Sequence, residues 1–453
     1  MHEYVSRILE GVIRRDPEQK EFHQAVTEFL KSVDSIIDQL PRLRFEKILE
    51  RMVEPERIVQ FRVPWVDDSG SLQINRGYRI QMSSALGPYK GGLRFHASVN
   101  LSVLKFLAFE QVYKNSLTGL LLGGGKGGSD FSPRGKSDRE VMAFCQSFMT
   151  ELTRHIGPDT DVPAGDIGVG AREIGYMFGQ YKRLANEFTG VFTGKSPVWG
   201  GSFIRPEATG YGLVYFAEQA LMDAGLSLSG STSLVSGSGN VAQYTIEKLL
   251  ERGSKPLTIS DSEGIIYDPE GIDNKKLAYI KTLKNVKRGR VKEYADTYRN
   301  SVFTPRSAYG EGNPLWNYPA DYAFPCATQN EINEVDARNL VANNIKAVME
   351  GANMPTNLEA QHILTGSGVI FGPGKAANAG GVAVSGLEMA QNSSRLQWTP
   401  QEVDARLVSI MKNIYKTVDQ AATTYAKKGD LVAGANIAGM LRVSDAMLAQ
   451  GYV

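Results

Sequence analysis

Apolar residues in the first part of the chain recur every three or four positions. Val5, Ile8 and Val12 show this spacing, which places their side chains on one side of a helix, and residues 1–60 have a helical pattern. Between residues 57 and 85, apolar and polar residues alternate on both sides of the turn sequence DDSGS. This pattern predicts helices followed by a β-hairpin or meander.

Helical spacing returns after Ser98, a residue type that often caps a helix, in the stretch NLSVLKFLAFEQVYKNSL. Two glycine-rich segments follow, LGGGKGGSDF and GPDTDVPAGDIGVG, and each precedes another helical pattern. We expect loops at both segments because glycine adopts the backbone conformations that turns require.

Strand and helix patterns alternate from about residue 200. The run STSLVSGSGNVAQYTIEKLLERG followed by PLTIS has the order strand, glycine turn, helix and strand, which requires a parallel sheet. Further strand patterns at YAFPCA, AVME and GVIFG extend it into a doubly wound, Rossmann-type α/β fold. We expect two α/β domains, residues 1–200 and 201–427, with a C-terminal helix at 428–453 that returns to the first.

Composition narrows the class of protein. The chain has 453 residues with 50 Lys or Arg and 49 Asp or Glu, a balance that gives no basic surface for nucleic acid or an anionic membrane. Cys145 and Cys326 provide neither a disulfide framework nor a metal-binding spacing. No apolar run approaches the roughly 20 residues that cross a bilayer, and the start has no signal-peptide pattern. We expect a cytoplasmic protein with no nucleic-acid, membrane or metal partner.

A glycine motif marks the first turn of the Rossmann-type domain. Gly237, Gly239 and Ala242 form G-x-G-x-x-A between a predicted strand and helix. The first glycine permits the tight turn, the second admits a pyrophosphate, and the small third residue packs the helix on the strand. The helix N-terminus offers amide donors to the phosphates. The motif favours a dinucleotide, with contacts at Ser238, Asn240 and Val241 as well, over a merely tight turn.

Residues after the second strand leave the choice of dinucleotide open. Asp261 lies 24 residues after Gly237, where an acidic residue holds the ribose of NAD. The following segment KTLKNVKRGRVK is strongly basic and is suited either to a 2'-phosphate or to a solvated helix face. Two segments resemble a phosphate-binding loop but do not match it: Lys126 is followed by Gly127 instead of Ser or Thr, and GVFTGKS has three residues between its glycines where the loop requires four. We therefore reject ATP or GTP as the main ligand.

Three lysines suggest a site for a small anion. Lys90 and Lys126 stand among glycines, which let a ligand approach both backbone and ammonium, and Lys114 lies one helical turn after Gln111. Gln111 and Lys114 can therefore hold one carboxylate together, and Lys90 is available for a second. The alternative is three unrelated surface lysines.

Two further residues have a structural and a chemical interpretation. Asp166 is either a turn former or the proton-transfer partner of Lys126, whose ammonium would be disfavoured by burial among neutral groups. Ser385 either caps a helix or faces a ligand. The five histidines form no hydrolase motif with Ser or Cys, so nucleophilic hydrolysis is unsupported.

Eight motifs in order resemble the hexameric glutamate dehydrogenases of bacteria, fungi and protists: GPYKGGLRF, GGGKGGSDF, DVPAGDIGVGAREIGYMFGQY, RPEATGYG, GSGNVA, PCATQNEI, EGANMPT and NAGGVAVSGLEM. The similarity covers nearly the whole chain. It implies an N-terminal domain for substrate binding and oligomerisation, a dinucleotide-binding domain, and a homohexamer. The implied reaction is the reversible conversion of 2-oxoglutarate, ammonium and a reduced nicotinamide to L-glutamate through 2-iminoglutarate.

The resemblance also implies a role for individual residues. Lys126 and Asp166 would share the proton transfers. Lys90 and Ser385 would bind the side-chain carboxylate of the substrate, and Gln111 and Lys114 would hold its α-carboxylate. Gly91, Arg205 and Val382 would also contact the substrate. The cofactor would also contact Thr209, Ala327, Thr328 and Asn353.

The sequence Ser260-Asp261-Ser262 is similar to the branch of the family that uses NADP, which implies NADPH as the cofactor and NAD as the less favoured one. Residues 306–318 match the family's motifs least well. A leucine-type or phenylalanine-type dehydrogenase is a weaker alternative, because its pocket would bury Lys90 against an apolar side chain. A non-catalytic NADP-binding protein is a further alternative, but such a protein would need neither Lys126 nor Asp166.

Overall fold

The computed structural model describes residues 2–452 and divides into two compact units. The first comprises Met1–Phe203, Val382–Val403 and Asn436–Val453, and the second comprises Ile204–Gly381 and Asp404–Ala435. Residues 382–403, expected in the second domain, thus belong to the first. Their helix packs there because Gly386 lies against Leu120, where an added Cβ would be 2.5 Å from Cδ1.

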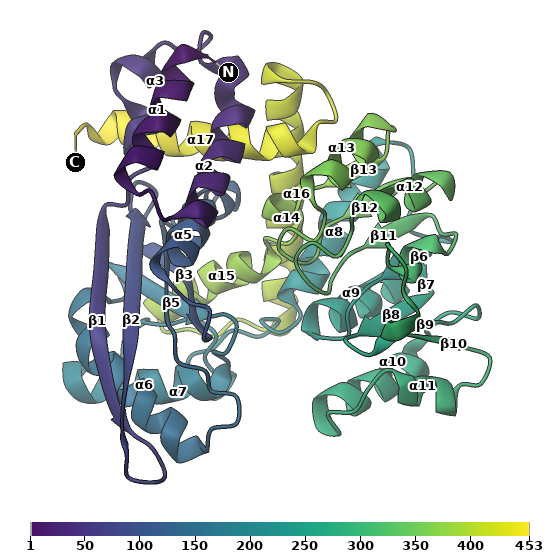
Figure 1. The fold of residues 1–453 in the computed structure, drawn as a ribbon, viewed down its shortest axis with the longest axis horizontal. Helices are drawn as coiled ribbons and strands as arrows, with labels where there is room; N and C mark the ends of the chain where they lie inside the picture. The colour runs from purple at the N-terminus through teal and green to yellow at the C-terminus, as the bar shows by residue number, and fades with distance from the viewer. Residues whose placement is uncertain (1, 453) are drawn as a thin grey trace. The chain divides into compact units, whose positions relative to one another are not determined.

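The first unit contains a mixed five-stranded sheet in the order β1-β2-β4-β3-β5. The predicted hairpin is confirmed, since its two long strands pair antiparallel with Val66 opposite Leu72 (Figure 1). The strands are β1 (Arg57–Val66), β2 (Leu72–Ser83), β3 (Tyr89–Phe95), β4 (Gly124–Ser129) and β5 (Asp161–Gly165). The helices before residue 200 are α1 (Glu3–Arg15), α2 (Lys20–Val33), α3 (Arg42–Phe45), α4 (Ile48–Met52), α5 (Leu101–Leu117), α6 (Asp138–Leu152) and α7 (Ala171–Ala185).

The two glycine-rich segments expected as loops each contain a strand, β4 and β5. Glycine is required in this sheet by close approach rather than by turns. A Cβ on Gly91 would lie 1.7 Å from the carbonyl oxygen of Gly125, and one on Gly124 would lie 2.3 Å from Val112 Cγ2 of α5. The glycines therefore let β3, β4 and α5 approach one another closely.

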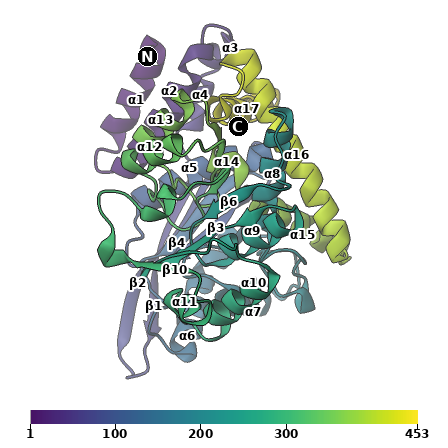
Figure 2. The same ribbon diagram turned by 90° about the vertical axis from the view of Figure 1, so that its right-hand side faces the viewer.

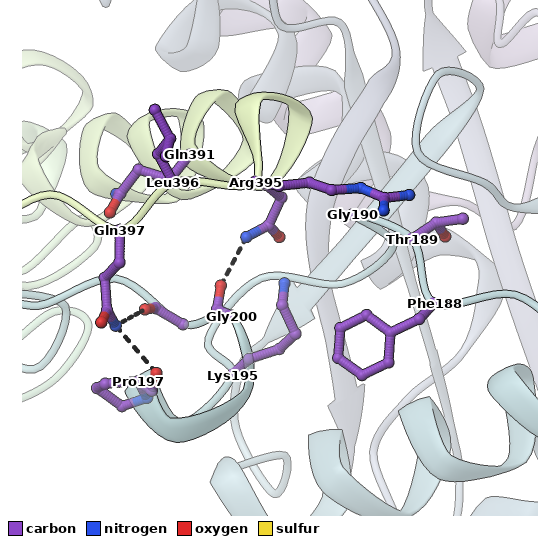
Figure 3. Close-up of a pocket in the computed structure, with 12 residues that line it drawn as sticks. Phe188, Thr189, Gly190, Lys195, Pro197, Gly200, Gln391, Arg395, Leu396 and Gln397 are labelled. Carbon is purple, nitrogen blue, oxygen red and sulfur yellow. Dashed lines mark hydrogen bonds between the residues drawn. The ribbon is translucent and has the colours of Figure 1, made fainter.

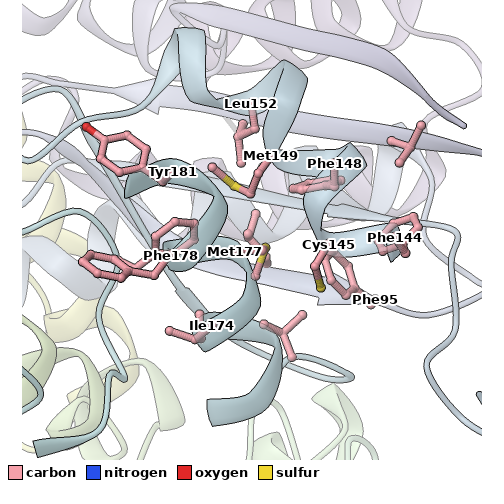
Figure 4. Packing of buried hydrophobic residues seen from close by; sticks show 14 of the residues in the cluster. Phe95, Phe144, Cys145, Phe148, Met149, Leu152, Ile174, Met177, Phe178 and Tyr181 are labelled. Atoms are coloured by element: carbon pink, nitrogen blue, oxygen red, sulfur yellow. The ribbon is translucent and has the colours of Figure 1, made fainter. Parts of the chain in front are cut away.

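Helix α5 is confirmed, but its N-cap is Asn100 rather than Ser98. The Asn100 side chain accepts a hydrogen bond of 3.0 Å from the Val103 amide, while the Ser98 hydroxyl binds His96. The core of this unit lies between the sheet and helices α6 and α7, where Phe95, Phe144 and Phe148 pack with Met149 and Met177 (Figure 4).

The second unit contains a parallel sheet in the order β13-β12-β11-β6-β7, with α12 and α13 packed on one face. Figure 2 gives the turned view, in which β6 and the helix that follows it, α9 (Asn240–Glu251), are labelled. A small antiparallel sheet, β10-β9-β8, continues from β7. The strands are β6 (Thr232–Val235), β7 (Lys255–Pro256), β8 (Thr258–Asp261), β9 (Gly264–Tyr267), β10 (Val302–Pro305), β11 (Tyr322–Phe324), β12 (Ala347–Met349) and β13 (Ile370–Gly372).

The predicted βαβ unit and the three later strands are confirmed as β6, α9, β7 with β8, and β11 to β13. The helices of this region are α8 (Ala208–Asp223), α9 (Asn240–Glu251), α10 (Asn274–Lys281), α11 (Lys292–Thr297), α12 (Glu334–Ala342), α13 (Leu358–Gly366) and α14 (Gly374–Ala377). Three helices continue from one unit into the other: α15 (Gly380–Ser394), α16 (Pro400–Tyr425) and α17 (Leu431–Gln450).

Helix α17 is long and apolar enough, by length and composition alone, to cross a membrane. In the structure 56% of the most apolar 18-residue stretch of this helix is buried. Arg442 of the same helix donates hydrogen bonds to the carbonyls of Ser116, Gly119 and Leu120. These contacts tie the helix to the end of α5.

Candidate active site

The first unit brings Lys126 and Asp166 into direct contact. Lys126 lies in β4 opposite Ile80 of β2, and its Nζ is 2.7 Å from Asp166 Oδ2. Asp166 follows β5, and a Cβ on Gly92 would lie 2.9 Å from the Asp166 Cβ, so the glycine of β3 admits this loop. Both side chains are largely buried, with 9% and 18% of their surface exposed. The predicted pairing of these two residues is therefore present in space.

A second cation contacts the same carboxylate. Arg94 Nε of β3 donates to Asp166 Oδ2 at 3.2 Å. Burial by itself raises the pKa of Asp166, but the charges of Lys126 and Arg94 outweigh it and lower this pKa to about 2. Asp166 is thus ionised at neutral pH. The sequence analysis did not single out Arg94, although it lies four residues after Lys90 and so on the same side of β3.

Lys90 is a buried lysine with defined partners. Only 1% of the residue is exposed, and its Nζ donates to the Val162 carbonyl at 2.9 Å and to Thr193 Oγ1 at 2.8 Å. The alternative of an unrelated surface lysine is therefore wrong for Lys90, and also for Lys126, which is 7% exposed. Thr193 was not predicted, because nothing in its local sequence links it to a residue more than 100 positions earlier.

Gln111 and Lys114 both lie in helix α5, and Gln111 is beside the glycine strands. A Cβ on Gly91 would lie 3.3 Å from Gln111 Cγ, and Asn115 Nδ2 donates to the carbonyls of Lys90 and Gly123. Asn115 thus fixes the helix against β3 and the start of β4. Gln111 Nε2 donates to Asn115 Oδ1 at 2.6 Å, which orients the Gln111 amide.

Val382 and Ser385 lie in α15, in its part that belongs to the first unit. Ser385 is 2% exposed and lies inside the helix, so the interpretation of this residue as an N-cap is wrong. One turn later, Glu388 binds Lys195 Nζ at 2.8 Å and accepts from the amide of Gly194 at 3.0 Å. These contacts join α15 to the segment that carries Thr193.

The second unit holds the glycine turn expected for a dinucleotide. Gly237 has φ of 82°, and a Cβ there would lie 2.8 Å from the Cys326 carbonyl oxygen, so this turn requires glycine. A Cβ on Gly239 would meet nothing within 4 Å, which leaves open space in front of α9. Ser238, Asn240 and Val241 form the rest of the turn and the first residues of the helix. The site therefore fits a pyrophosphate at the helix N-terminus.

Asp261 ends β8 and is tied to the basic segment. Its Oδ2 is 2.8 Å from Lys284 Nζ and accepts from the Val291 amide at 2.9 Å. Burial by itself raises the pKa of Asp261. The hydrogen bonds from Lys284, from the Val291 amide and from the Glu263 amide outweigh burial, so the pKa lies below its usual value. Ser262 is exposed and its Oγ accepts from Arg290 at 3.0 Å. The carboxylate charge is thus neutralised, while a hydroxyl and a guanidinium lie side by side at the surface.

The remaining predicted residues of the second unit lie in three groups. Arg205 and Thr209 are near Gly381, where a Cβ would be 2.7 Å from Thr209 Oγ1. Asn353 Oδ1 accepts from Asn378 at 3.1 Å. The amides of Ala327 and Thr328 follow β11 and donate to Glu331 Oε1 at 2.9 and 3.3 Å, a carboxylate that the sequence analysis missed.

The described residues 2–452 contain no group of three or more His, Cys, Asp or Glu side chains that could hold a metal ion. A parallel sheet with a glycine turn before a helix, together with a buried lysine and aspartate pair, defines the class of protein as a two-unit α/β dehydrogenase.

Comparison with known proteins gives the family. Residues 55–183 match the Glu/Leu/Phe/Val dehydrogenase dimerisation domain, and residues 200–451 match glutamate/leucine/phenylalanine/valine dehydrogenase. The chain belongs to this family, and the predicted resemblance is confirmed.

Similar proteins match over their full length. An NADP-specific glutamate dehydrogenase of Giardia intestinalis is 57% identical, with 99% of both chains covered. One of Helicobacter pylori is 56% identical, with 99% of this chain and 100% of the relative covered. The crystal structure of Plasmodium falciparum glutamate dehydrogenase has a TM-score of 0.96 at 51% identity and covers 100% of this chain and 95% of that one.

Proposed function

We propose that this chain is an NADP-dependent glutamate dehydrogenase, an oxidoreductase that acts on the CH–NH2 group of its donor. It converts 2-oxoglutarate, ammonium and NADPH reversibly to L-glutamate, water and NADP. The observation that carries the proposal is the buried pair of Lys126 and Asp166 between the glycine strands, in a chain with full-length NADP-specific relatives.

The positions of the substrate residues support the roles that we propose for them. Lys90 and Ser385 bind the distal carboxylate of the substrate, since Lys90 is buried with its ammonium fixed by Val162 and Thr193. Gln111 and Lys114, neighbours on α5, bind the carboxylate next to the reacting carbon. Gly91 and Val382 complete this site. Arg205, Thr209 and Asn353 are assigned to the substrate and nicotinamide contacts of the second unit.

Lys126 and Asp166 move the protons. When ammonia adds to the carbonyl carbon of 2-oxoglutarate, Lys126 donates a hydrogen bond to the oxygen that becomes negative and protonates it to a hydroxyl group. The proton that Asp166 takes from nitrogen then returns to Lys126, which protonates the hydroxyl group so that it leaves as water. Asp166, ionised beside Lys126, accepts the proton released by nitrogen. Bound NADPH supplies the hydride that reduces the resulting 2-iminoglutarate. Arg94 and Lys126 hold the Asp166 carboxylate in position throughout.

The cofactor site accounts for the choice of NADP. The turn from Gly237 to Val241 holds the pyrophosphate, and Ala327 and Thr328 line the loop after β11. Ser262 and Arg290 offer a hydroxyl and a guanidinium to the 2'-phosphate. Asp261 orders this segment through Lys284 and Val291 instead of repelling the phosphate.

The assembly proposed for the chain is a homohexamer in the cytoplasm. Strand β1 pairs only with β2 among the described strands, so that its other edge is available to a second copy of the chain.

The test is the initial rate of NADPH and of NADH oxidation with 2-oxoglutarate and ammonium, each omitted in turn. We expect a rate that requires both substrates and is much higher with NADPH. Arg290→Gln should raise the KM for NADPH about tenfold and leave that for NADH unchanged, since one charged hydrogen bond contributes roughly 1.5–3 kcal/mol. A folded protein without activity contradicts the proposal, and equal losses for both cofactors contradict the role of Arg290.

A further inference from the structure

The five-stranded sheet of the first unit has two halves, one of β1, β2 and β4 and one of β3 and β5. Strand β4, which carries Lys126, pairs with β2, and β3 pairs with β5. Within the described part of the chain, the ladder that joins the halves runs from Leu93 opposite Gly127 to Phe95 opposite Ser129. The halves are therefore paired at one end of β3 and β4, and Lys126 lies beyond that end.

The two halves carry different members of the proposed active site. Lys126 belongs to β4, whereas Lys90 belongs to β3 and Asp166 follows β5. The distance of 2.7 Å between Lys126 Nζ and Asp166 Oδ2 thus depends on how the halves are held together beside the site. A misplacement of about 1 Å between reacting groups can lower a rate about a hundredfold.

A buried arginine joins the halves at this end. Arg79 of β2 donates from Nε to Asp161 Oδ2 at 2.9 Å and from Nη2 to Asp161 Oδ1, and both side chains are 0% exposed. Its Nη1 donates to the Gly91 carbonyl of β3 at 3.1 Å. Arg79 thus starts in one half and binds both strands of the other, with the fixed geometry of a bidentate pair. Asn115 of α5 also links the halves, through backbone carbonyls only.

The glycines on both sides of Lys126 make room for the Arg79 side chain. A Cβ on Gly127 would lie 3.0 Å from Arg79 Cδ, and one on Gly125 would lie 3.5 Å from Arg79 Nη2. Because side chains alternate along a strand, Lys126 lies on the face of β4 opposite these two contacts. Arg79 therefore supports the strand of Lys126 from behind.

Other buried ion pairs of this unit join helices and loops. Lys105 of α5 binds Asp16 Oδ2, in the connection between α1 and α2, at 2.8 Å. Lys195, which lines a cavity of about 520 Å³ beside the end of α15 (Figure 3), binds Glu388 of that helix. Arg79 differs from both lysines because its partners lie on two strands of the sheet.

We propose that Arg79 is a positioning residue of the active site. Through Asp161 and the Gly91 carbonyl it sets the separation of the two halves of the sheet, and so aligns Lys126 with Asp166. This role rests on the function proposed above for Lys126 and Asp166, whereas the link between the halves does not depend on that function.

Arg79→Lys in the full-length protein tests the role, because lysine keeps the buried charge but cannot form the bidentate pair. We expect kcat to fall about a hundredfold, with the dissociation constant of NADPH unchanged, since the proposed cofactor residues lie in the second unit. Burial raises the pKa of Asp166 and the charge of Lys126 lowers it, so a wider gap should also move the acidic limb of the kcat profile to higher pH. An unchanged kcat, or a lower kcat with an unmoved limb, overturns the proposal.

Two further variants separate positioning from stability. Lys105→Met removes another buried cation of the same unit, and it should lower the melting temperature but keep kcat and its pH profile. The double variant Arg79→Met and Asp161→Leu leaves neither partner as an unpaired buried charge, so it should fold even where a single replacement does not. It should show the same loss of kcat. A folded double variant with wild-type kcat, or a moved limb in Lys105→Met, counts against Arg79.

Hydrogen exchange tests the link between the halves without the reaction. In Arg79→Lys, amide exchange followed by mass spectrometry should become faster in the peptides that contain Gly91 and Lys126 and stay unchanged in β1. Equal acceleration throughout the sheet, or none, overturns the link. A wild-type protein without activity would refute the proposed reaction, and the exchange pattern would still decide whether Arg79 holds the two halves together.

Discussion

The Asp166 carboxylate is the residue on which the proposed chemistry depends most. It is buried, yet Lys126 and Arg94 both contact its Oδ2 atom and keep it ionised. An ionised carboxylate can accept a proton from nitrogen, whereas a neutral amide of the same shape cannot.

Asp166→Asn tests this role. We expect kcat to fall by about two to four orders of magnitude, the range for loss of general acid–base catalysis, with NADPH affinity unchanged. Steady-state rates and fluorescence titration with NADPH measure the two quantities. Asp159→Asn is the control, because Asp159 is exposed in the same unit. Loss of cofactor binding would instead indicate a structural role.

Arg94 sets the proton affinity of Asp166. The charge of Arg94 lowers the Asp166 pKa, so its removal must raise that pKa and move the acidic limb of the kcat profile to higher pH. We expect Arg94→Gln to move the acidic limb to higher pH by about one pH unit. Arg94→Lys keeps the positive charge and should leave the limb close to its wild-type position. A profile of unchanged shape with a uniformly lower kcat would show that Arg94 acts only in packing.

At the scale of elements, the loop after β11 carries a second unusual carboxyl group. Glu331 accepts from the amides of Ala327 and Thr328, next to the turn that begins at Ser236. Burial raises the pKa of Glu331, and these hydrogen bonds lower it by a smaller amount, so that the pKa is about 7. Its charge therefore changes within the physiological pH range.

The sign of the effect follows from the charge. Below pH 7 Glu331 is mainly neutral, and above it the group adds a negative charge beside the site proposed for the pyrophosphate. The dissociation constant of NADPH should rise between pH 6 and pH 8, and Glu331→Gln should flatten this rise while keeping the hydrogen-bonding shape. Fluorescence titration across that range measures both. An equally steep rise in the variant would assign the dependence to another group.

At the scale of the whole molecule, the hairpin of β1 and β2 predicts assembly. Strand β1 is long, has no second partner among the described strands, and exposes Val66 beside Leu72 and Ile74, which are 52%, 64% and 62% exposed. Apolar side chains on an open strand edge favour pairing with another copy.

We expect the double variant Val66→Lys and Leu72→Lys to reduce the assembled mass, because two added charges would be buried at the contact. Light scattering with size-exclusion chromatography measures the mass. Ile13→Lys serves as the control, since Ile13 is a comparably exposed apolar residue on α1. A double variant with the wild-type mass would place the subunit contact elsewhere.

Much of the fold is determined by local sequence. The alternation at 57–85 gives the hairpin, and the strand, turn and helix around Gly237 give the βαβ unit, because side-chain periodicity and turn chemistry act over a few residues. The pairing of Lys126 with Asp166 was also foreseen. In contrast, the glycine segments were expected as loops and instead contain strands β4 and β5. The sequence does not distinguish a glycine that permits a turn from a glycine that permits close packing of strands.

The sequence by itself determined the family, the order of elements and the residue types of the site, through motifs that are contiguous along the chain. Only the tertiary structure decided that Arg94 shares Asp166 with Lys126, that Thr193 holds Lys90, and that the end of α15 closes a cavity with residues 188–201. The reason is physical: burial, ion pairing and cavity shape depend on segments separated by up to about two hundred residues, whose approach is fixed by packing of the whole unit rather than by local pattern.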